Sequence, residues 1–219
     1  MMDEIKIKPY HRSYRDEVFR IAADSAFFGE PVEAFLDDRR LFCDAQIRYY
    51  TEFEADYTWV VCVKNRVVGY VTGCVDTAAQ RKRHLIRIIA PLVGRAFQGK
   101  YNLGRKTWRF TRSILGGVLR KEFPKVNYGE YPAHLHINVD ASSRGQGLGQ
   151  KLMDAYLNQL RKLGIPGVFL GTTNLNKAAC KLYEKVGFKL LDARQTRVWS
   201  SLVEKSVENR SYGLKLVER

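Results

Sequence analysis

Residues 135–149 read LHINVDASSRGQGLG, and this stretch decides the fold. Its first part, Leu135 to Val139, is an apolar run that predicts a β-strand. Its last part, Arg144 to Gly149, is rich in glycine and opens a segment to Leu163 that has the spacing of an amphipathic helix. A strand, a glycine-rich turn and a helix in this order present bare backbone N–H groups and a helix N-terminus. This arrangement favours a phosphate-bearing ligand.

Three kinds of phosphate-binding turn can be compared with this stretch. A Walker loop requires G-x-x-x-x-G-K-[ST], and the chain contains no such string. A dinucleotide turn requires G-x-G-x-x-G and an acid about 20 residues later. Here the order is R-x-x-G-x-G, and Phe169, Leu170 and Gly171 offer no acid. The third kind is the pyrophosphate turn of acyl-coenzyme A transferases. The alternative is a glycine-rich helix start that binds no ligand.

A second pattern follows the glycine turn and consists of Asn176, Ala179, Tyr183, Gly187 and Phe188. Together with residues 139–149, it resembles the GNAT superfamily of N-acetyltransferases. That family has a strand ending V-x-P-x-x-R/Q-G-x-G-x-G/A, a helix, a strand, and then N-x-x-A-x-x-x-Y-x-x-x-G-F. The match covers roughly residues 133–190. One departure is Ala141, where the family often has Pro, and this change affects the stiffness of the turn more than its chemistry.

The resemblance implies an α/β (α+β) GNAT fold, with a mixed central sheet of about six to seven strands flanked by helices. It implies acetyl-CoA or coenzyme A as cofactor and a primary amine as acceptor. The stretch 131–137 is also similar to acetyltransferase-like domains found in bacteria and attached to some O-GlcNAc hydrolases. This chain keeps the glycine turn, which favours cofactor binding.

Composition is typical of one globular domain over residues 1–219. The hydrophobic content of 45% suits a sizeable core. No run reaches the roughly 18 apolar residues of a membrane span, and the first residues have no apolar signal core. The four cysteines form no C-x-x-C pair, so we expect no zinc site and a reduced, cytoplasmic setting.

The residue pattern predicts an ordered succession of strands and helices. Strands are expected at 5–7, 58–63, 67–75, 134–139, 168–172, 188–191 and 211–217, with a turn at Asn65-Arg66. Helices are expected at 11–26, 35–54, 148–163 and 177–186.

Positive charge is concentrated between the predicted hairpin and the strand at 134–139. The chain has a net charge of +14, and residues 78–126 contain thirteen basic residues and one acid. Residues 78–127 are an insertion relative to a minimal GNAT domain. Within it the pattern predicts basic amphipathic helices at 83–97 and 108–123, joined by a turn at 99–104.

Several roles for this insertion stay open. Its apolar faces can cover the core or line an acceptor pocket while its arginines face water. It can also bind an acidic or phosphate-bearing acceptor, or an anionic membrane surface. Arginine near Tyr101, Trp108 and Phe110 would suit nucleic acid, but no nucleic-acid motif is present. A second copy of the chain is a further candidate partner.

Cofactor contacts follow from the resemblance. Ile137 and Val139 should pair with the pantetheine amides through their backbone. The N–H groups of the glycine turn should hold the pyrophosphate. Arg144 could pair with a phosphate or be a surface arginine, and Asn176 could bind the pantetheine arm or only cap its helix. The expected set is Ile137, Val139, Arg144, Gly145, Gln146, Gly147, Leu148, Gly149, Gln150 and Asn176.

Amide formation from a thioester requires a proton acceptor for the amine and a proton donor for the departing sulfur. Tyr183 lies two helical turns after Asn176 and resembles the tyrosine that protonates the sulfur; a buried core tyrosine is the alternative. His134 and His136 share one face of a strand, and neutral imidazole suits the base. The alternative is a hydrogen-bonded pair in the core.

Other candidates for the base are Asp76, Glu52, Glu54 and a chain of water molecules. Asn138 shares the face of the histidines and could orient the acceptor. No metal ligands are expected, and Cys180 suits packing better than nucleophilic attack. The sequence therefore predicts direct acetyl transfer in a ternary complex. The alternative is a non-catalytic module that binds coenzyme A, an anionic membrane or an acidic protein.

Overall fold

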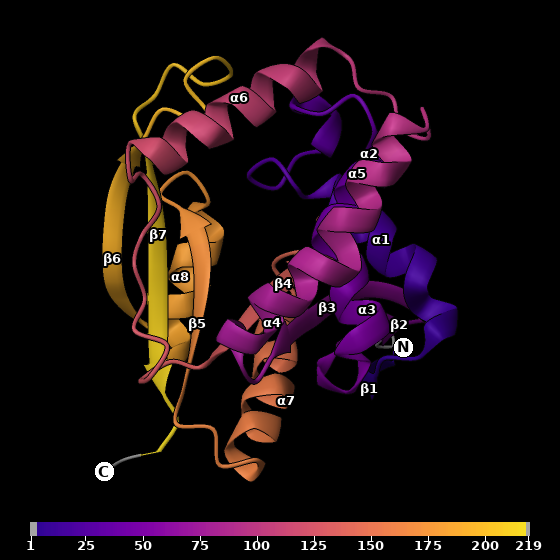
Figure 1. The fold of residues 1–219 in the computed structure, drawn as a ribbon. Coiled ribbons are helices and arrows are strands. Elements are labelled where there is room, and N and C mark those ends of the chain that lie inside the picture. Colours follow the sequence, from indigo (N-terminus) through magenta and orange to yellow (C-terminus); the bar gives the residue numbers. More distant parts are fainter. Residues whose placement is uncertain (1–3, 218–219) are drawn as a thin grey trace.

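The computed structural model describes residues 4–217 and shows a seven-stranded mixed sheet in the order β1-β2-β3-β4-β5-β7-β6 (Figure 1). Neighbouring strands are antiparallel except β4 and β5, which are parallel. The strands are β1 Ile5–Pro9, β2 Trp59–Val63, β3 Arg66–Cys74, β4 Ala133–Val139, β5 Gly167–Thr173, β6 Lys189–Thr196 and β7 Val207–Lys215. The predicted mixed sheet of six to seven strands is confirmed.

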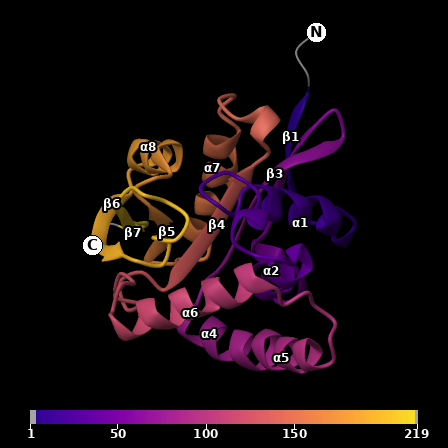
Figure 2. The same ribbon diagram turned by 90° about the horizontal axis from the view of Figure 1, so that it is seen from above.

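Helices cover both faces of this sheet (Figure 2). They are α1 Arg15–Asp24, α2 Arg39–Gln46, α3 Arg48–Phe53, α4 Thr77–His84, α5 Ala90–Phe97, α6 Arg105–Leu119, α7 Leu148–Lys162 and α8 Lys177–Val186. Successive strand residues point to opposite faces. In β2, Val61 therefore packs in the core beneath α7, whereas Val60 packs beneath α1.

The predicted helices at 11–26 and 35–54 differ from the structure at their starts. His11 caps a short 3-10 turn, so α1 begins only at Arg15. The second prediction was wrong for its first residues, because α2 begins after Asp38, whose carboxylate accepts a hydrogen bond from the Leu41 N–H. Ile47 then separates α2 from α3.

The basic segment forms helices with boundaries that differ from the prediction. Asp76 caps α4 by accepting a hydrogen bond from the Ala79 N–H, so the first helix begins six residues earlier than the predicted 83. A π-helical turn, Leu85–Ile89, joins α4 to α5. The second helix, α6, is shifted toward the N-terminus, and Phe123 lies beyond its end.

Two further findings concern the described part of the chain. All four cysteines are buried and unpaired. Between residues 4 and 217, none of the helices has the length and apolar content to cross a membrane, and no cluster of three or more metal-ligating side chains occurs.

Candidate functional site

The site lies where β4 and β5 diverge. These parallel strands pair only at Ala133 with Val168 and at His134 with Phe169, although both continue for several residues. Beyond this point the edge of β4 toward β5 has no strand partner. A groove of about 220 Å³ opens there, and its lining includes His136, Ile137, Asn138, Gly171, Asn176 and Tyr183. Four of the predicted site residues, His136, Ile137, Asn176 and Tyr183, therefore line one groove, whereas His134 and Val139 do not line it.

The glycine turn connects β4 to α7 at the end of this groove. Gly145 and Gly147 have φ values of +79° and +74°, a backbone conformation that favours glycine. Space is open beside both residues, because no heavy atom lies within 4 Å of a Cβ added to either one. The first N–H groups of α7 have no partner within the helix. Open space beside unpartnered N–H groups fits a pyrophosphate.

Neighbouring residues of the turn have more specific surroundings. A Cβ at Gly149 would meet the Leu182 side chain at 3.0 Å, so this glycine allows α7 and α8 to pack closely. The Gln150 side chain donates to Asp154, while its buried Oε1 has no hydrogen-bond partner among residues 4–217. This unpartnered oxygen is a hydrogen-bond acceptor, so it suits an N–H or O–H donor rather than a phosphate oxygen.

The Arg144 guanidinium is hydrogen-bonded to backbone carbonyl groups. It donates to the carbonyl oxygens of Val139 at 3.2 Å and Gly29 at 3.1 Å. Arg144 thereby ties the end of β4 to the loop that follows α1. Its direct pairing with a phosphate stays a prediction.

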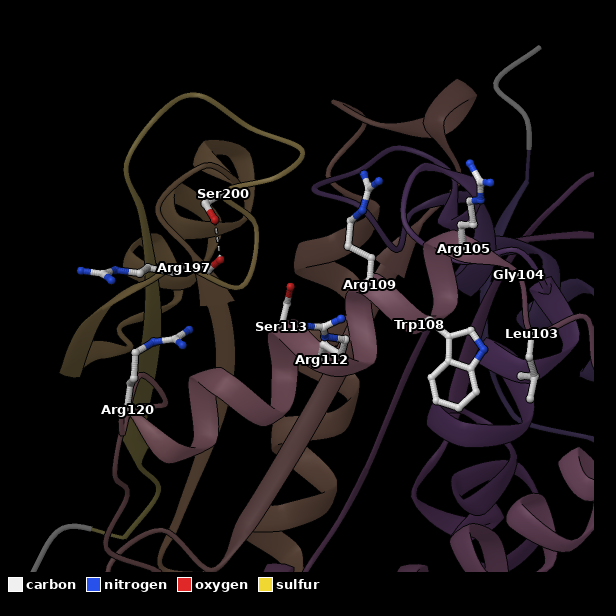
Figure 3. A pocket seen from close by; sticks show the side chains of 10 residues that line it. All are labelled: Leu103, Gly104, Arg105, Trp108, Arg109, Arg112, Ser113, Arg120, Arg197 and Ser200. Carbon is white, nitrogen blue, oxygen red and sulfur yellow. Dashed lines mark hydrogen bonds between the residues drawn. The ribbon is translucent and has the colours of Figure 1, made fainter.

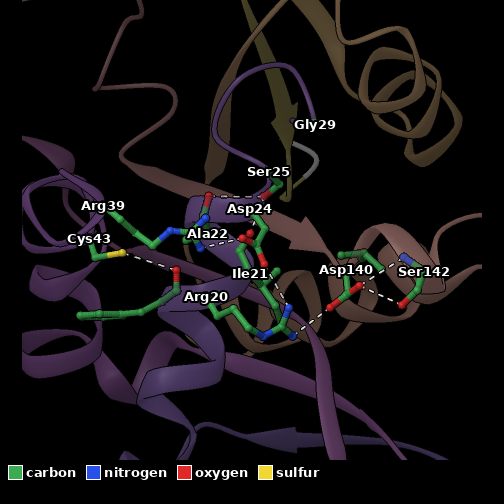
Figure 4. A network of polar contacts seen from close by, with 12 residues as sticks. Arg20, Ile21, Ala22, Asp24, Ser25, Gly29, Arg39, Cys43, Asp140 and Ser142 are labelled. Carbon is green, nitrogen blue, oxygen red and sulfur yellow. Dashed lines mark hydrogen bonds and ion pairs between the residues drawn. The ribbon is translucent and has the colours of Figure 1, made fainter. Parts of the chain in front are cut away.

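An ion-pair network fixes α1 and α2 against the same turn (Figure 4). Arg20 contacts Asp140 at 2.8 Å, and Asp140 also accepts hydrogen bonds from the Ser142 backbone and hydroxyl. Asp24 pairs with both Arg20 and Arg39. These contacts hold α1 beside the glycine turn.

Tyr50 connects the two histidines of β4. Its hydroxyl lies 2.6 Å from His134 Nε2 and 3.1 Å from His136 Nε2. His134 Nδ1 lies 2.8 Å from the Thr77 hydroxyl, which donates its own proton to the Pro132 carbonyl. Tyr50 is not among the predicted site residues, since no local pattern relates residue 50 to a strand more than eighty positions later.

The hydrogen-bond network assigns a direction to each proton in this chain. Because the Thr77 proton is committed to Pro132, the Thr77 oxygen accepts from His134 Nδ1–H. His134 Nε2 is then an acceptor, and the Tyr50 hydroxyl donates a hydrogen bond to it. The Tyr50 oxygen in turn accepts from His136 Nε2–H, which leaves Nδ1 as the proton acceptor of His136.

Both imidazoles are neutral near pH 7. Burial, together with smaller contributions from the neighbouring His136, Arg81 and His84, lowers the pKa of His134 to about 3. Partial desolvation by the surrounding protein, with the nearby His84 as a second cause, also lowers the pKa of His136. His136 nevertheless remains exposed to the groove, whereas His134 is buried. Water therefore solvates His136 more than it solvates His134. An amine substrate in the groove can reach the His136 ring.

Tyr183 reaches the groove from α8. Its ring packs against Phe188 and Tyr212, and burial raises the pKa of its hydroxyl, so the hydroxyl stays protonated at neutral pH. No protein hydrogen bond to this hydroxyl is found within the described chain. Asn176 caps α8 by accepting from the Ala179 N–H at 3.3 Å while it also lines the groove. Capping and ligand binding by Asn176 are compatible.

The other predicted candidates have structural partners. Glu54 accepts a hydrogen bond from Tyr49, Glu52 pairs with Arg48, and Asp76 caps α4. Asn138 lines the groove and donates to the Tyr70 hydroxyl at 2.9 Å. The Cys180 thiol is buried and lies 3.6 Å from the Thr173 carbonyl oxygen. Of these groups, only Asn138 contributes to the groove.

Comparison with known proteins agrees with this geometry. The acetyltransferase (GNAT) family matches residues 107–188, from α6 to the start of β6. This match supports the predicted resemblance to the GNAT superfamily. In sequence, the chain is 36% identical over 69 residues to N-acetyltransferase 8B of Homo sapiens, a match that covers 32% of this chain and 30% of the human protein. The chain thus spans less than a third of that relative.

Solved structures show the same fold over nearly the whole chain. The crystal structure of SsHAT superposes with a TM-score of 0.74 at 24% identity and covers 98% of this chain and 100% of SsHAT. The yncA protein of Salmonella typhimurium, solved with its cofactor acetyl-CoA, has a TM-score of 0.59 at 14% identity and covers 98% and 95% of the two chains. The predicted GNAT fold is confirmed.

Proposed function

We propose that this GNAT protein is a single-domain N-acetyltransferase that transfers an acetyl group directly from acetyl-CoA to a primary amine. One observation supports the proposal above others. The divergence of β4 and β5 joins an open glycine turn to a groove that contains both an accessible neutral imidazole and a protonated tyrosine. These are the parts that a direct transfer requires.

Acetyl-CoA, when bound, supplies the activated acetyl group as a thioester. The N–H groups from Gly145 to Gln150 bind its pyrophosphate at the start of α7. The free edge of β4 at Ile137 and Val139 pairs with the pantetheine amides, and the Asn176 side-chain amide assists. Together these contacts orient the thioester in the groove.

His136 acts as the general base in this proposal. Its Nδ1 takes the proton from the attacking amine, and its Nε2–H stays directed at Tyr50. His134 is a positioning residue, because it lies behind Tyr50 and holds the Tyr50 hydroxyl in place. Tyr183 donates its proton to the departing sulfur. The base therefore acts on the acceptor and the acid acts on the leaving group.

Calorimetric titration with acetyl-CoA, followed by a thiol-release assay, tests the proposal. We expect micromolar binding and release of free thiol when the correct amine is added. The amines would include a small primary amine, a lysine-containing peptide and a peptide with a free N-terminus. Absence of acetyl-CoA binding by the folded protein would refute the proposed enzyme activity and favour a non-catalytic module. Binding without transfer to any amine would support a module that binds coenzyme A.

A further inference from the structure

A large basic pocket lies outside the acetyl-CoA groove, along α6 and the loop after β6 (Figure 3). Its volume is about 890 Å³, and no acidic side chain lines it. Five arginines contribute to the lining: Arg105, Arg109, Arg112, Arg120 and Arg197. Arg120 pairs with Glu122, but the guanidinium groups of the other four have no ion pair or hydrogen bond among residues 4–217. Unneutralised guanidinium groups around one pocket favour an anionic ligand.

An exposed apolar stripe runs along α6 beside these arginines. Trp108, Leu115 and Leu119 are 60%, 59% and 83% exposed. Residues spaced by seven and eleven lie on the same side of a helix, so the three side chains form one stripe. The opposite side of α6 is the one that packs, since Thr107 and Gly117 are buried there and Phe110 contacts Phe35 and Trp199. The stripe has no partner within the described protein.

The first helix of the basic segment has an exposed apolar face as well. Leu85, Ile86, Val93 and Phe97 are all exposed, Phe97 to 90%. Among residues 4–217, nine of the fifteen exposed large hydrophobic residues lie between Leu85 and Phe123. Figures 1 and 2 place α4, α5 and α6 on the same side of the molecule. Exposed apolar side chains are therefore concentrated where the net positive charge is concentrated.

We propose that α6 and the α4–α5 helix form a docking surface for a lipid bilayer that contains anionic phospholipids. The free arginines bind lipid phosphates, and the adjacent stripe of Trp108, Leu115 and Leu119 enters the boundary between headgroups and acyl chains. A second copy of the chain fits this surface poorly. Residues 78–126 carry a net charge of +12, so the same segments of two copies would repel each other. An anionic bilayer supplies negative charge and an apolar phase together.

Vesicle co-sedimentation and tryptophan fluorescence test the docking surface. The probe is the full chain with vesicles of equal parts phosphatidylglycerol and phosphatidylcholine, compared with phosphatidylcholine alone. We expect binding to the anionic vesicles only, weakened by salt, together with a blue shift of the emission. Trp108 should carry this shift, since Trp59 is hydrogen-bonded to Gln159 and Trp199 packs among phenylalanines. Trp108→Phe should abolish it.

Charge variants separate a defined surface from general attraction. A triple variant, Arg105→Gln, Arg109→Gln and Arg112→Gln, should weaken partition about a hundredfold, since each arginine near an anionic surface contributes about fivefold. The matched variant Arg161→Gln, Lys162→Gln and Lys189→Gln removes the same charge from exposed positions on α7 and β6 and should bind like wild type. Circular dichroism and thermal unfolding would confirm that both variants fold.

Three outcomes would overturn the docking surface. The first is the absence of binding to anionic vesicles at low salt. The second is equal loss in the matched variant, which would show attraction by net charge alone. The third is binding to polyglutamate or inorganic phosphate with the same arginine dependence but no Trp108 shift on vesicles, which would assign the pocket to a water-borne anion. None of these measurements requires acetyl-CoA, so the result is independent of the proposed enzyme activity.

Discussion

Gly147→Ala should separate cofactor binding from fold stability at the start of α7. Gly147 has a φ of +74°, and a Cβ added there meets no atom within 4 Å. The chain offers a matched control at the other end of the same helix. Gly164 has a φ of +67° and equally open space. Alanine at either position therefore causes the same backbone strain without a clash.

The expected magnitudes differ between stability and affinity. An L-residue in the left-handed region costs about 1–2 kcal/mol, so both variants should lose this much free energy of unfolding. At Gly147 the added methyl group also occupies the space where the pyrophosphate would approach the N–H groups. Loss of one charge-assisted hydrogen bond there, about 1.5–3 kcal/mol, corresponds to a roughly 10- to 150-fold increase in Kd.

Urea unfolding and calorimetric titration with acetyl-CoA measure the two quantities on the same samples. We expect Gly164→Ala to bind acetyl-CoA like wild type and Gly147→Ala to bind much more weakly, while the two variants unfold at similar urea concentrations. Equal cofactor affinity in both variants would refute the assignment of the pyrophosphate to this turn. A much larger loss of stability in Gly147→Ala would refute the claim that its surroundings are open.

The remaining predictions concern the groove. Tyr183→Phe should leave the Kd for acetyl-CoA unchanged and slow acetyl transfer about a hundredfold or more, measured by thiol release; an unchanged rate would remove the tyrosine from proton donation. The free energy of unfolding should fall by about 1.4 kcal/mol per pH unit from His134 as pH drops below 6.5, because the unfolded histidine binds a proton that the buried ring, with a pKa of about 3, does not. Urea titrations between pH 6.5 and 5 test this, and His134→Gln should reduce the slope. Tyr50→Phe should cost about 1–3 kcal/mol of stability by leaving His134 Nε2 without a donor, and unaltered urea unfolding would contradict the assigned proton direction.

Local chemistry explains why some elements were predictable. The predicted helix 177–186 agrees with α8 at both ends, because Asn176 caps its start and Gly187 ends it with a φ of +104°. Asp76 has the same kind of capping side chain at the start of α4, although it was predicted only as a candidate base. A cap depends on neighbours within one helical turn, so sequence contains most of the information that sets it.

Long-range packing explains what sequence did not show. The histidine pair was predictable from its spacing on β4, but its connection through Tyr50 depends on how α3 packs against the sheet. Arg144 was recognisable as part of a glycine turn, yet its side chain binds the carbonyl of Gly29, more than a hundred residues earlier. Such contacts follow from the assembled fold, since nothing near these residues in sequence specifies the partner.

The two histidines of β4 have identical side chains but different surroundings, and the proposed mechanism gives them different roles. His134 is buried, and its two ring nitrogens are engaged with Thr77 and Tyr50, so it has no site left for a substrate proton. His136 uses only Nε2 toward Tyr50 and is exposed to the groove. A proton taken by His136 at Nδ1 would make an imidazolium whose Nε2–H bond to the Tyr50 oxygen strengthens. His134 therefore lowers the free energy of unfolding in acid. In the proposed mechanism it also positions Tyr50, whose oxygen stabilises the charged form of His136.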